Sequence, residues 1–323
     1  MVMHFDGWAK SNGVVRRFNE DNQALGHRLL TALESGQARH SRFFSTIIVD
    51  EAQDFETSWY KCLLEAIDDP DDGDLIIVGD GSQGLYGNKK IVWKQIGIHA
   101  QGRTISKKFD LEVNYRNSRE ILELAAAFAS KSEDPENEET LVALEVDPRK
   151  CKRSTGILPH LLHVASPMEE VQQVMRIVKG LLDGDWFGLR VDPLRPEQIA
   201  IFYPYVAKRD RHLLEQLASG LEKLAPAVWI NRDPSQRNRI AEQAIKIQTI
   251  HSAKGLQYRA VIVMWSDLLP KQFGETTEED ERKLMYVALN RPEDFLVLTT
   301  SRPSSFIKEK SDSGKAVEVG ARN

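Results

Sequence analysis

Short apolar runs alternate with segments of helical periodicity along most of the chain. The runs read TIIV, LIIV, QIAIF, AIKIQT, AVIVMW and FLVLT, over residues 46–49, 75–78, 198–202, 244–249, 260–265 and 295–299. Most are apolar at successive positions and are bounded by turn-forming residues, the pattern of a strand in a parallel sheet buried on both faces. Apolar residues at helical spacing over 119–130 and 168–182 predict helices that cover such sheets. The pattern therefore predicts an α/β fold.

The composition is that of a globular protein without an overall attraction to polyanions. The chain has 323 residues, 41% of them hydrophobic and 28% charged, with a formal net charge of -5. Wholesale disorder is excluded by this balance, and any binding of nucleic acid needs a local basic surface. Cys62 and Cys151 form neither a disulfide framework nor a metal-binding cluster, which favours a reducing compartment. With no signal segment and no apolar run of about 18 residues, we expect a cytoplasmic protein that does not interact with membranes.

Two carboxylates follow the first apolar run, in the string TIIVDEAQDF. Asp50 and Glu51 would stand at the C-terminal end of a strand, the edge at which open parallel sheets bind ligands. In nucleotide hydrolases an acid at this position holds Mg²⁺, and its neighbour orients or deprotonates the attacking water. The alternative is a solvated acidic loop.

The second run continues into LIIVGDGSQGLYG, which contains the spacing GxGxxG at Gly79, Gly81 and Gly84. A dinucleotide site, and with it a nicotinamide oxidoreductase, is disfavoured because Asp80 would set a carboxylate against the pyrophosphate and no helix pattern follows. Gln83, beyond the strand end, is instead suited to sensing a γ-phosphate. The alternative is a plain glycine turn.

An aromatic and basic cluster follows this string. Tyr86 and Trp93 lie close in sequence to Lys89 and Lys90, a combination that can stack a nucleic-acid base and contact phosphates. Packing of both rings in a core is the alternative.

These strings, in this order, resemble the motifs of the UvrD/Rep-like superfamily 1 DNA helicases. VDEAQD and VGDGSQGLYG are similar to motifs II and III, and LEVNYRNSREIL, IQTIHSAKGLQYRAVIV and ERKLMYVALNRPEDFLVLT are similar to motifs IV, V and VI. The resemblance implies two RecA-like parallel-sheet lobes of the P-loop NTPase type, the first incomplete. Residues 1–109 would be the rear part of the first lobe and residues 110–301 the second, with residues 302–323 a disordered polar tail.

The resemblance also implies roles for individual residues. Catalysis would fall to Glu51, Gln83, Arg116 and Arg291, with the nucleotide also contacted by Asp50 (through Mg²⁺), Lys254, Gly255 and Gln257. Thr249, His251 and Ser252 would join Tyr86 and Trp93 in binding nucleic acid. The arginines fit the chemistry, since phosphoryl transfer in this family needs cations presented by the second lobe.

The sequence around Arg291 carries an argument of its own. Leu284, Val287 and Ala288 form an apolar helical stripe after an acidic start, and Pro292 discourages continuation of the helix. We therefore expect the Arg291 guanidinium at a helix end, free to reach across a cleft. A surface arginine near a helix terminus is the alternative.

The largest departure from the family is a missing phosphate-binding loop. No GxxxxGK[ST] occurs, and the only Gly-Lys pair, Gly314–Lys315, is followed by Ala316. Gln257 and Asn290 also replace the family's usual Glu and Thr. We therefore expect weak or absent ATP binding and negligible hydrolysis by this chain alone.

The expected function is that of a fragment of an ATP-dependent DNA helicase or translocase that moves on single-stranded DNA. ATP and Mg²⁺ are its expected cofactors in the intact protein, and an N-terminal helicase segment or subunit is an expected partner. The alternative is a nonenzymatic, degenerate helicase module that binds nucleic acid or a protein.

Overall fold

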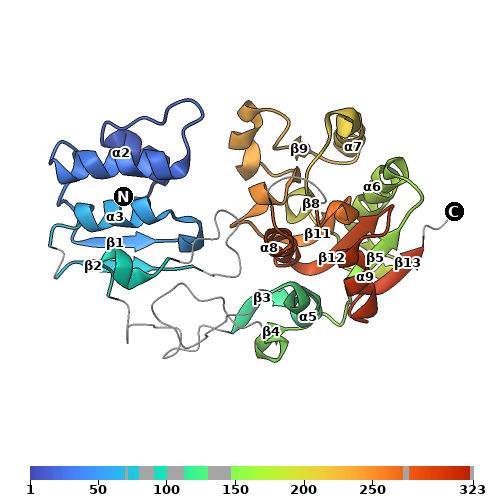
Figure 1. The fold of residues 1–323 in the computed structure, drawn as a ribbon. Helices are drawn as coiled ribbons and strands as arrows, with labels where there is room; N and C mark the ends of the chain where they lie inside the picture. Colours follow the sequence, from blue (N-terminus) through green and yellow to red (C-terminus); the bar gives the residue numbers. More distant parts are fainter. Residues whose placement is uncertain (70–71, 80–90, 100–112, 130–146, 272–275, 321–323) are drawn as a thin grey trace. The chain divides into compact units, whose positions relative to one another are not determined.

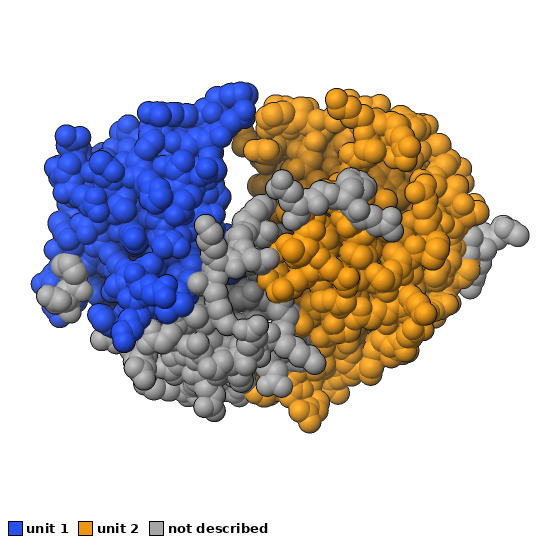
Figure 2. Space-filling model, in the orientation of Figure 1, with its two compact units in different colours: residues 1–111, 131–144 blue, residues 112–130, 145–323 orange. Residues whose placement is uncertain are grey.

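The chain forms two compact units (Figures 1 and 2). The structure is a computed structural model that describes residues 1–69, 72–79, 91–99, 113–129, 147–271 and 276–320. Contacts group residues 1–111 with 131–144 into unit 1 and residues 112–130 with 145–323 into unit 2. The lobe boundary expected at residue 109 falls outside the described residues and stays a prediction.

Unit 1 is built on two parallel strands. Its elements are α1 (Phe5–Ser11), α2 (Asn22–Glu34), β1 (Thr46–Val49), α3 (Thr57–Ala66), β2 (Asp74–Ile77) and the short 3-10 helices η1 (Ala52–Asp54) and η3 (Trp93–Ile96). Helix α3 connects β1 to β2, with Val49 paired to Ile77. One face of this sheet packs on α2 and α3, with Leu25, Leu29 and Tyr60 fully buried.

The other face of the unit 1 sheet is open. Ile48 is 67% exposed, Ile76 42% and Val78 51%. Within the described residues, neither β1 nor β2 has a further strand beside it. The strands were expected to be buried on both faces; here the expectation is wrong, because among the described residues helices cover one face only.

Unit 2 contains a seven-stranded parallel sheet with the order β13-β5-β12-β11-β8-β10-β9. The strands are β5 (His160–His163), β8 (Ile199–Tyr203), β9 (Ala227–Trp229), β10 (Ile245–Thr249), β11 (Tyr258–Val263), β12 (Pro292–Thr300) and β13 (Val317–Gly320). The two parallel sheets confirm the α/β class predicted from the apolar runs.

Helices cover the central strands of this sheet. Helices α6 (Pro167–Asp183) and α7 (Arg211–Glu222) pack on one face, on a core that includes Ile201, Ile247 and Ile262. Helices α5 (Arg119–Ala125) and α8 (Glu278–Leu289) contact each other and β12. Two small sheets complete the unit, β3 (Asn114–Ser118) with β4 (Cys151–Arg153) and β6 (Asp185–Trp186) with β7 (Leu189–Arg190). Across the part of the chain that the structure describes, no helix has the length and apolarity needed to cross a membrane.

The C-terminal segment differs from the expected disordered tail. Residues after 301 form α9 (Ser305–Asp312) and the edge strand β13. Ser304 caps α9 by accepting a hydrogen bond from the backbone N–H of Ile307 at 3.2 Å, and Phe306 is fully buried. A polar segment thus folds because its two adjacent apolar residues dock on unit 2.

A short connection joins two strands of the large sheet that lie on either side of β8. Because β10 and β11 both run parallel to β8, the chain must return from the C-terminal end of β10 to the N-terminal end of β11. Residues 250–257 make this return with one 3-10 turn, η9 (His251–Ala253), and no α-helix. We call this segment the 250–257 connection; several predicted site residues lie on it.

Candidate functional site

The two acids of unit 1 stand where the sequence predicted, directly after β1. Glu51 has a φ of 53°, so the backbone turns sharply in the left-handed region at this residue. The backbone N–H of Glu51 donates to Asp50 Oδ1 at 2.9 Å, and Gln53 Nε2 donates to Glu51 Oε2 at 2.6 Å. Asp50 is exposed and Glu51 is half-buried.

The end of β2 approaches this turn closely. The backbone N–H of Ala52 donates to the carbonyl of Val78 at 3.0 Å. A Cβ atom at Gly79 would lie 2.6 Å from Gln53 Oε1, so only glycine fits without displacing the side chain that holds Glu51. The acids are therefore held by backbone geometry and by Gln53.

Asp50 suits a Mg²⁺ ion that is shared with a bound phosphate. Mg²⁺ typically takes one or two protein carboxylates and completes its octahedron with water and substrate oxygens. Asp50 uses Oδ1 for the turn, which leaves the exposed Oδ2 to face a ligand. Among the described residues, no group of three or more His, Cys, Asp or Glu side chains is arranged to hold a metal alone. A Mg²⁺ ion held by Asp50 would therefore need further oxygen ligands from water or a bound phosphate.

In unit 2, two predicted site residues are in contact. Arg116, on β3, and Gln257, at the end of the 250–257 connection, both have exposed side chains. With its amide oxygen turned toward the guanidinium, Gln257 accepts a hydrogen bond from Arg116 Nη2 at 2.7 Å. The contact brings together residues 141 positions apart in the sequence.

Arg291 stands at the predicted helix end but its side chain is buried. A capping box of Thr277 and Asp280 starts α8, which ends at Leu289. Arg291 is only 1% exposed, its Nε donates to the carbonyl of Val287 at 3.1 Å and its Nη1 donates to that of Leu256 at 3.5 Å. The expectation of a guanidinium free to reach outward is therefore wrong for this conformation.

The burial of Arg291 has a physical cause. The last carbonyls of a helix have no partner within the helix, and a buried guanidinium needs acceptors for its N–H groups. Val287 lies in the last turn of α8, so its carbonyl and the Arg291 side chain satisfy each other. Reaching a ligand would require this bond to break.

The rest of the 250–257 connection carries two further predicted nucleotide contacts. Lys254 is half-buried and Gly255 is exposed. Gly255 has a φ of 75°, a conformation that side chains disfavour, so its glycine is explained by backbone geometry. Leu256 then accepts the bond from Arg291, which ties this segment to the end of α8.

Thr249, Ser252 and Asn231 form a hydrogen-bonded trio at the opposite, C-terminal edge of the sheet. Thr249 Oγ1 donates to Ser252 Oγ at 3.0 Å, and Asn231 Nδ2 donates to the same Ser252 oxygen at 2.8 Å. The Thr249 N–H donates to Asn231 Oδ1 at 2.8 Å. Sequence analysis predicted Thr249 and Ser252 but missed Asn231, which lies in a loop without periodicity.

His251 lies next to this trio with an exposed side chain. Loss of water around the ring is the main cause that lowers its pKa; Glu281 opposes this effect and Lys271 reinforces it. Its predicted role in binding nucleic acid stays a prediction.

Basic side chains lie on the segments that follow β8 and β9. We call them the basic rim, and they are Lys208, Arg209, Arg211 and Arg232, all exposed. Arg211 lies 5.0 Å over the ring of Trp229 and donates to the carbonyl of Arg232 at 2.7 Å. Both segments start at the C-terminal edge of the sheet, which also carries the trio. Asp210 and Glu215 balance part of this charge, at 3.5 Å from Arg209 and 3.8 Å from Arg211.

Three predicted site residues of unit 1 remain: Trp93, Gln83 and Tyr86. Trp93 is 4% exposed and packs at 5.2 Å against Tyr60 in the core, so the prediction that it stacks a base is wrong. Gln83 and Tyr86 lie outside the described residues. An aromatic residue near lysines gives the same sequence pattern whether its ring is buried in the core or exposed on the surface.

One exposed aromatic residue near Arg116 was missed. Tyr115, on β3, is 68% exposed, unlike most rings in unit 2. An exposed ring beside an arginine is a surface on which a planar base can stack. The string NYR, already assigned to motif IV, was the available signal.

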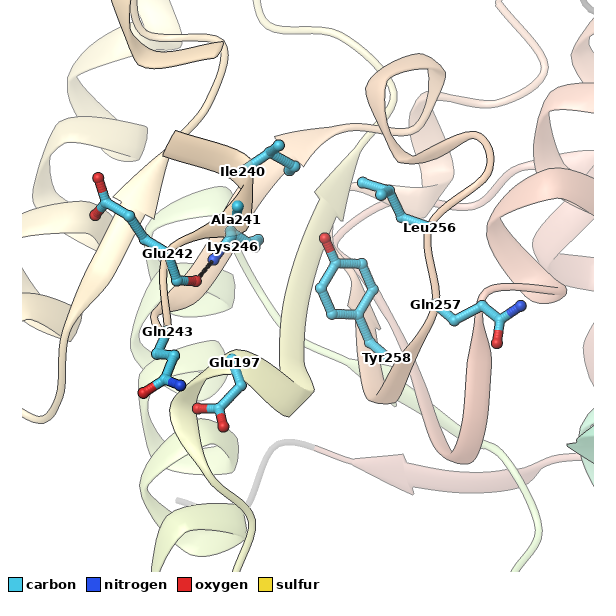
Figure 3. A pocket seen from close by; sticks show the side chains of 9 residues that line it. All are labelled: Glu197, Ile240, Ala241, Glu242, Gln243, Lys246, Leu256, Gln257 and Tyr258. Carbon is cyan, nitrogen blue, oxygen red and sulfur yellow. Dashed lines mark hydrogen bonds between the residues drawn. The ribbon is translucent and has the colours of Figure 1, made fainter. Parts of the chain in front are cut away.

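A cavity of about 230 Å³ opens beside Gln257, at the N-terminal edge of the sheet (Figure 3). Its lining includes Glu197, Lys246, Leu256 and Tyr258. Lys246 is 2% exposed, and its Nζ donates to the carbonyls of Glu242 and Ala244, the latter at 2.9 Å. Burial lowers its pKa. The lysine therefore caps backbone carbonyls at the start of β10.

Comparisons with known proteins found a family model and two relatives that are similar to parts of this chain. Residues 190–303 match the family described as the UvrD-like helicase C-terminal domain. The chain is 35% identical over 91 residues to the ATP-dependent DNA helicase PcrA of Staphylococcus aureus, covering 22% of this chain and 12% of that protein. It is 32% identical over 75 residues to the putative ATP-dependent DNA helicase YjcD of Bacillus subtilis, covering 20% and 10%.

A solved structure is also similar. It is the C-terminal domain of a possible DNA helicase from Lactobacillus plantarum, with 18% identity and a TM-score of 0.40, covering 65% of this chain and all of that one. The matched segments span only about a tenth of the length of the two curated relatives.

Proposed function

The chain carries a UvrD-like helicase C-terminal domain over residues 190–303, and from this we propose that it is the C-terminal part of an ATP-dependent DNA helicase or translocase. In this proposal the acids of unit 1 and the arginines of unit 2 are nucleotide-binding residues, and the C-terminal edge of the large sheet binds single-stranded DNA. Hydrolysis then drives movement along the strand.

The observation that carries the proposal is the course of the 250–257 connection. It starts at the Thr249–Ser252–Asn231 trio and ends at the Gln257–Arg116 contact, with Arg291 bonded to Leu256. One short segment thus joins a polar, basic edge to an edge that carries two arginines. A motor that couples phosphate chemistry to DNA binding needs such a link.

The arginines supply the charge that phosphoryl transfer requires. Bridging Mg²⁺ and guanidinium groups stabilise the negative charge that spreads over the transferring phosphoryl group. Arg116 is exposed and positioned by Gln257, whereas Arg291 must leave the carbonyls of Val287 and Leu256. Asp50 would hold the Mg²⁺ and Glu51 would orient the attacking water.

The Thr249–Ser252–Asn231 trio and the basic rim suit a DNA backbone. Hydroxyl, amide and cationic groups are the usual partners of phosphate oxygens, and contacts of this kind carry no sequence information. We therefore expect binding that depends strongly on salt and weakly on sequence.

The open face of the unit 1 sheet supports a requirement for a further polypeptide segment. Parallel sheets are nearly always covered on both faces, and a two-stranded sheet is marginal alone. Ile48, Ile76 and Val78 present apolar surface next to the strand end that carries Asp50 and Glu51. We propose that a helicase segment with the phosphate-binding loop covers this face, and that ATP binds only then.

Titration of ATP tests the proposal. Labelled ATP with Mg²⁺ is added to the chain alone and to the chain mixed with a helicase N-terminal segment that contains GxxxxGK[ST]. We expect saturable binding and DNA-stimulated hydrolysis only in the mixture. Glu51→Gln should lower kcat about 100- to 1,000-fold, because a positioned base typically contributes this much.

Glu34→Gln is the matched control, since Glu34 is exposed on α2 of the same unit. Equal activity of the Glu51→Gln variant and the parent mixture would contradict the assigned role of Glu51. Absence of binding in every mixture would contradict the ATP site.

A nonenzymatic binding module is the second candidate. The burial of Arg291 and the missing phosphate-binding loop favour it. It predicts that the chain alone binds single-stranded DNA with an affinity that no added nucleotide or N-terminal segment changes, as fluorescence anisotropy would measure.

A further inference from the structure

Asn117, the residue after Arg116, reaches the residues on both sides of Arg291. It is 1% exposed, and its Nδ2 donates to the carbonyl of Asn290 at 3.1 Å and to that of Pro292 at 2.6 Å. One side-chain amide thus satisfies two buried carbonyls 173 and 175 positions away in the sequence. The contact fixes the backbone that carries Arg116 to the backbone that carries Arg291.

A second side chain strengthens the same junction. Arg153, on β4, donates to the backbone carbonyl of Arg116 and to the carboxylate of Asp294 on β12. Asp294 also accepts from Arg259 Nε at 2.8 Å, and its side chain is only 5% exposed. The strand that carries Arg116 and the strand after Arg291 are therefore joined through buried or half-buried charged side chains, whose hydrogen bonds are stronger than those between neutral groups.

Helix α9 also joins the end of the helical segment that follows β3 to the first turns of α8. We call this group the α9 cage; its members are Phe128, Arg282, Phe306, Glu309 and Lys310. Arg282, on α8, binds both carboxylate oxygens of Glu309, at 2.9 and 3.0 Å.

Aromatic rings complete the cage. The Arg282 guanidinium lies 5.1 Å over the ring of Phe128 and 5.0 Å over that of Phe306. Lys310 is fully buried, 4.2 Å over Phe128. Phe128 ends the helical segment that begins directly after β3, whereas Phe306, Glu309 and Lys310 belong to α9.

The contacts of Asn117 and the contacts of the α9 cage lie at opposite ends of the two elements that carry Arg116 and lead to Arg291. β3 and α5 carry Arg116 and lead to Phe128, and α8 carries Arg282 and leads to Arg291. Asn117 fixes one end of this pair of elements, and the α9 cage fixes the other. A pair held at both ends cannot slide or rotate without breaking buried contacts.

We propose that Asn117 and helix α9 are positioning elements that hold Arg116 and Arg291 in a fixed relation. The proposal rests on the proposed function, because it concerns the arginines assigned there to the nucleotide. It adds that α9, which follows the matched residues 190–303, helps to hold the elements that carry the two arginines. Neither Asn117 nor α9 needs to contact the nucleotide.

Hydrogen exchange and NMR test the proposal without any nucleotide. Asn117→Asp keeps the shape of the side chain but removes both N–H donors and faces two carbonyls with a carboxylate. Glu309→Gln removes the charge that holds Arg282. In both variants we expect the Arg291 Nε–H signal and the amides of residues 114–118 and 289–291 to exchange at least about tenfold faster, since buried carbonyls or charges lose their partners.

Two controls make the result specific. Lys308→Ala changes an exposed residue of α9 outside the cage and should leave the exchange rates unchanged. The amides of β10 report that the core stays folded in every variant. Should Asn117→Asp fail to fold, Glu309→Gln and Arg282→Lys still decide the matter, because both alter the cage at a half-exposed ion pair.

Unchanged protection of the Arg291 Nε–H in folded variants would overturn the positioning roles. Faster exchange would support them. Because ATP is absent from these measurements, a failure of the proposed ATP site would appear only in the titration described above.

Discussion

The parallel sheet of unit 1 and the seven-stranded parallel sheet of unit 2 are built from similar strand sequences but are covered differently. TIIV and LIIV in unit 1 are as apolar as AVIVMW and FLVLT in unit 2. In unit 2 both faces of the central strands are buried, whereas in unit 1 Ile48 is 67% exposed. The difference shows that apolar strand sequences alone do not determine whether both faces of a sheet are buried.

The largest expected effect comes from a substitution that places a charged side chain in the core of the seven-stranded sheet of unit 2. Ile262, on β11, is fully buried in the core formed with α6 and α7. Ile262→Asp should abolish folding of unit 2, since an unpaired buried carboxylate costs more than the whole stability of a typical domain. Loss of the cooperative thermal transition measures this; a folded variant would contradict the buried environment.

The next effect tests whether the C-terminal segment belongs to the covered sheet. Phe306 is fully buried and packs at 5.3 Å against Phe128. Phe306→Ala should destabilise unit 2 by about 3–5 kcal/mol, the usual cost of truncating a buried phenylalanine. Urea unfolding measures the change, and Val317→Ala, at a 40% exposed position of β13, is the control.

The stability of unit 2 should also depend on pH. Burial raises the pKa of Glu170 to about 7, although Thr299 and the backbone of Trp265 hydrogen-bond its carboxylate and oppose the shift. The folded state then binds more protons than the unfolded state between about pH 4.5 and 7, so unit 2 loses stability as the pH rises through this window. The expected loss is about 3 kcal/mol at most.

Lys310 makes the stability of unit 2 depend on pH with the opposite sign, and over a higher pH range. Burial lowers its pKa from 10.5 to about 7, so the unfolded state binds more protons between these values and stability rises with pH. Unit 2 should therefore be least stable near pH 7. Urea unfolding across this pH range measures the profile; Glu170→Gln should remove the acid side of the minimum, whereas Asp183→Asn, at an exposed position, should leave it intact.

The smallest effect on stability is expected at the open face. Ile48→Asp should change the free energy of unfolding of the chain alone by no more than about 0.5 kcal/mol, because the side chain already faces water. The same variant should lose binding of the N-terminal segment, as calorimetry would measure. A large destabilisation of the chain alone would mean that the face is already covered.

Much of the fold was predictable because it depends on local patterns. Six apolar runs and the helices at 119–130 and 168–182 correspond to described elements, the former helix ending in a 3-10 turn at Phe128. Strand β5 and the α9–β13 segment were missed, since their apolar residues are few and become buried only through distant partners. Local periodicity does not report such docking.

The site was predictable only in part, for the same reason. Motif strings identified Arg116, Gln257 and Arg291, and the contact of Arg116 with Gln257 is present. The burial of Arg291 and the bonds of Asn117 depend on residues far away in the sequence, as do the bonds between Asn231 and Ser252. Trp93 shows the converse error: its sequence neighbours suggested an exposed ring, but tertiary packing buries the ring in the core.

The 250–257 connection has little spare length. β11 is six residues long, which is about 20 Å at about 3.3 Å per residue. Eight residues that include the 3-10 turn η9 and a second turn, in which the Leu256 N–H donates to the Ala253 carbonyl at 3.0 Å, reach at most about 23 Å. The segment is therefore nearly taut, and a displacement of Ser252 by a bound strand would pull Leu256, and with it the carbonyl that holds Arg291, instead of being absorbed as slack.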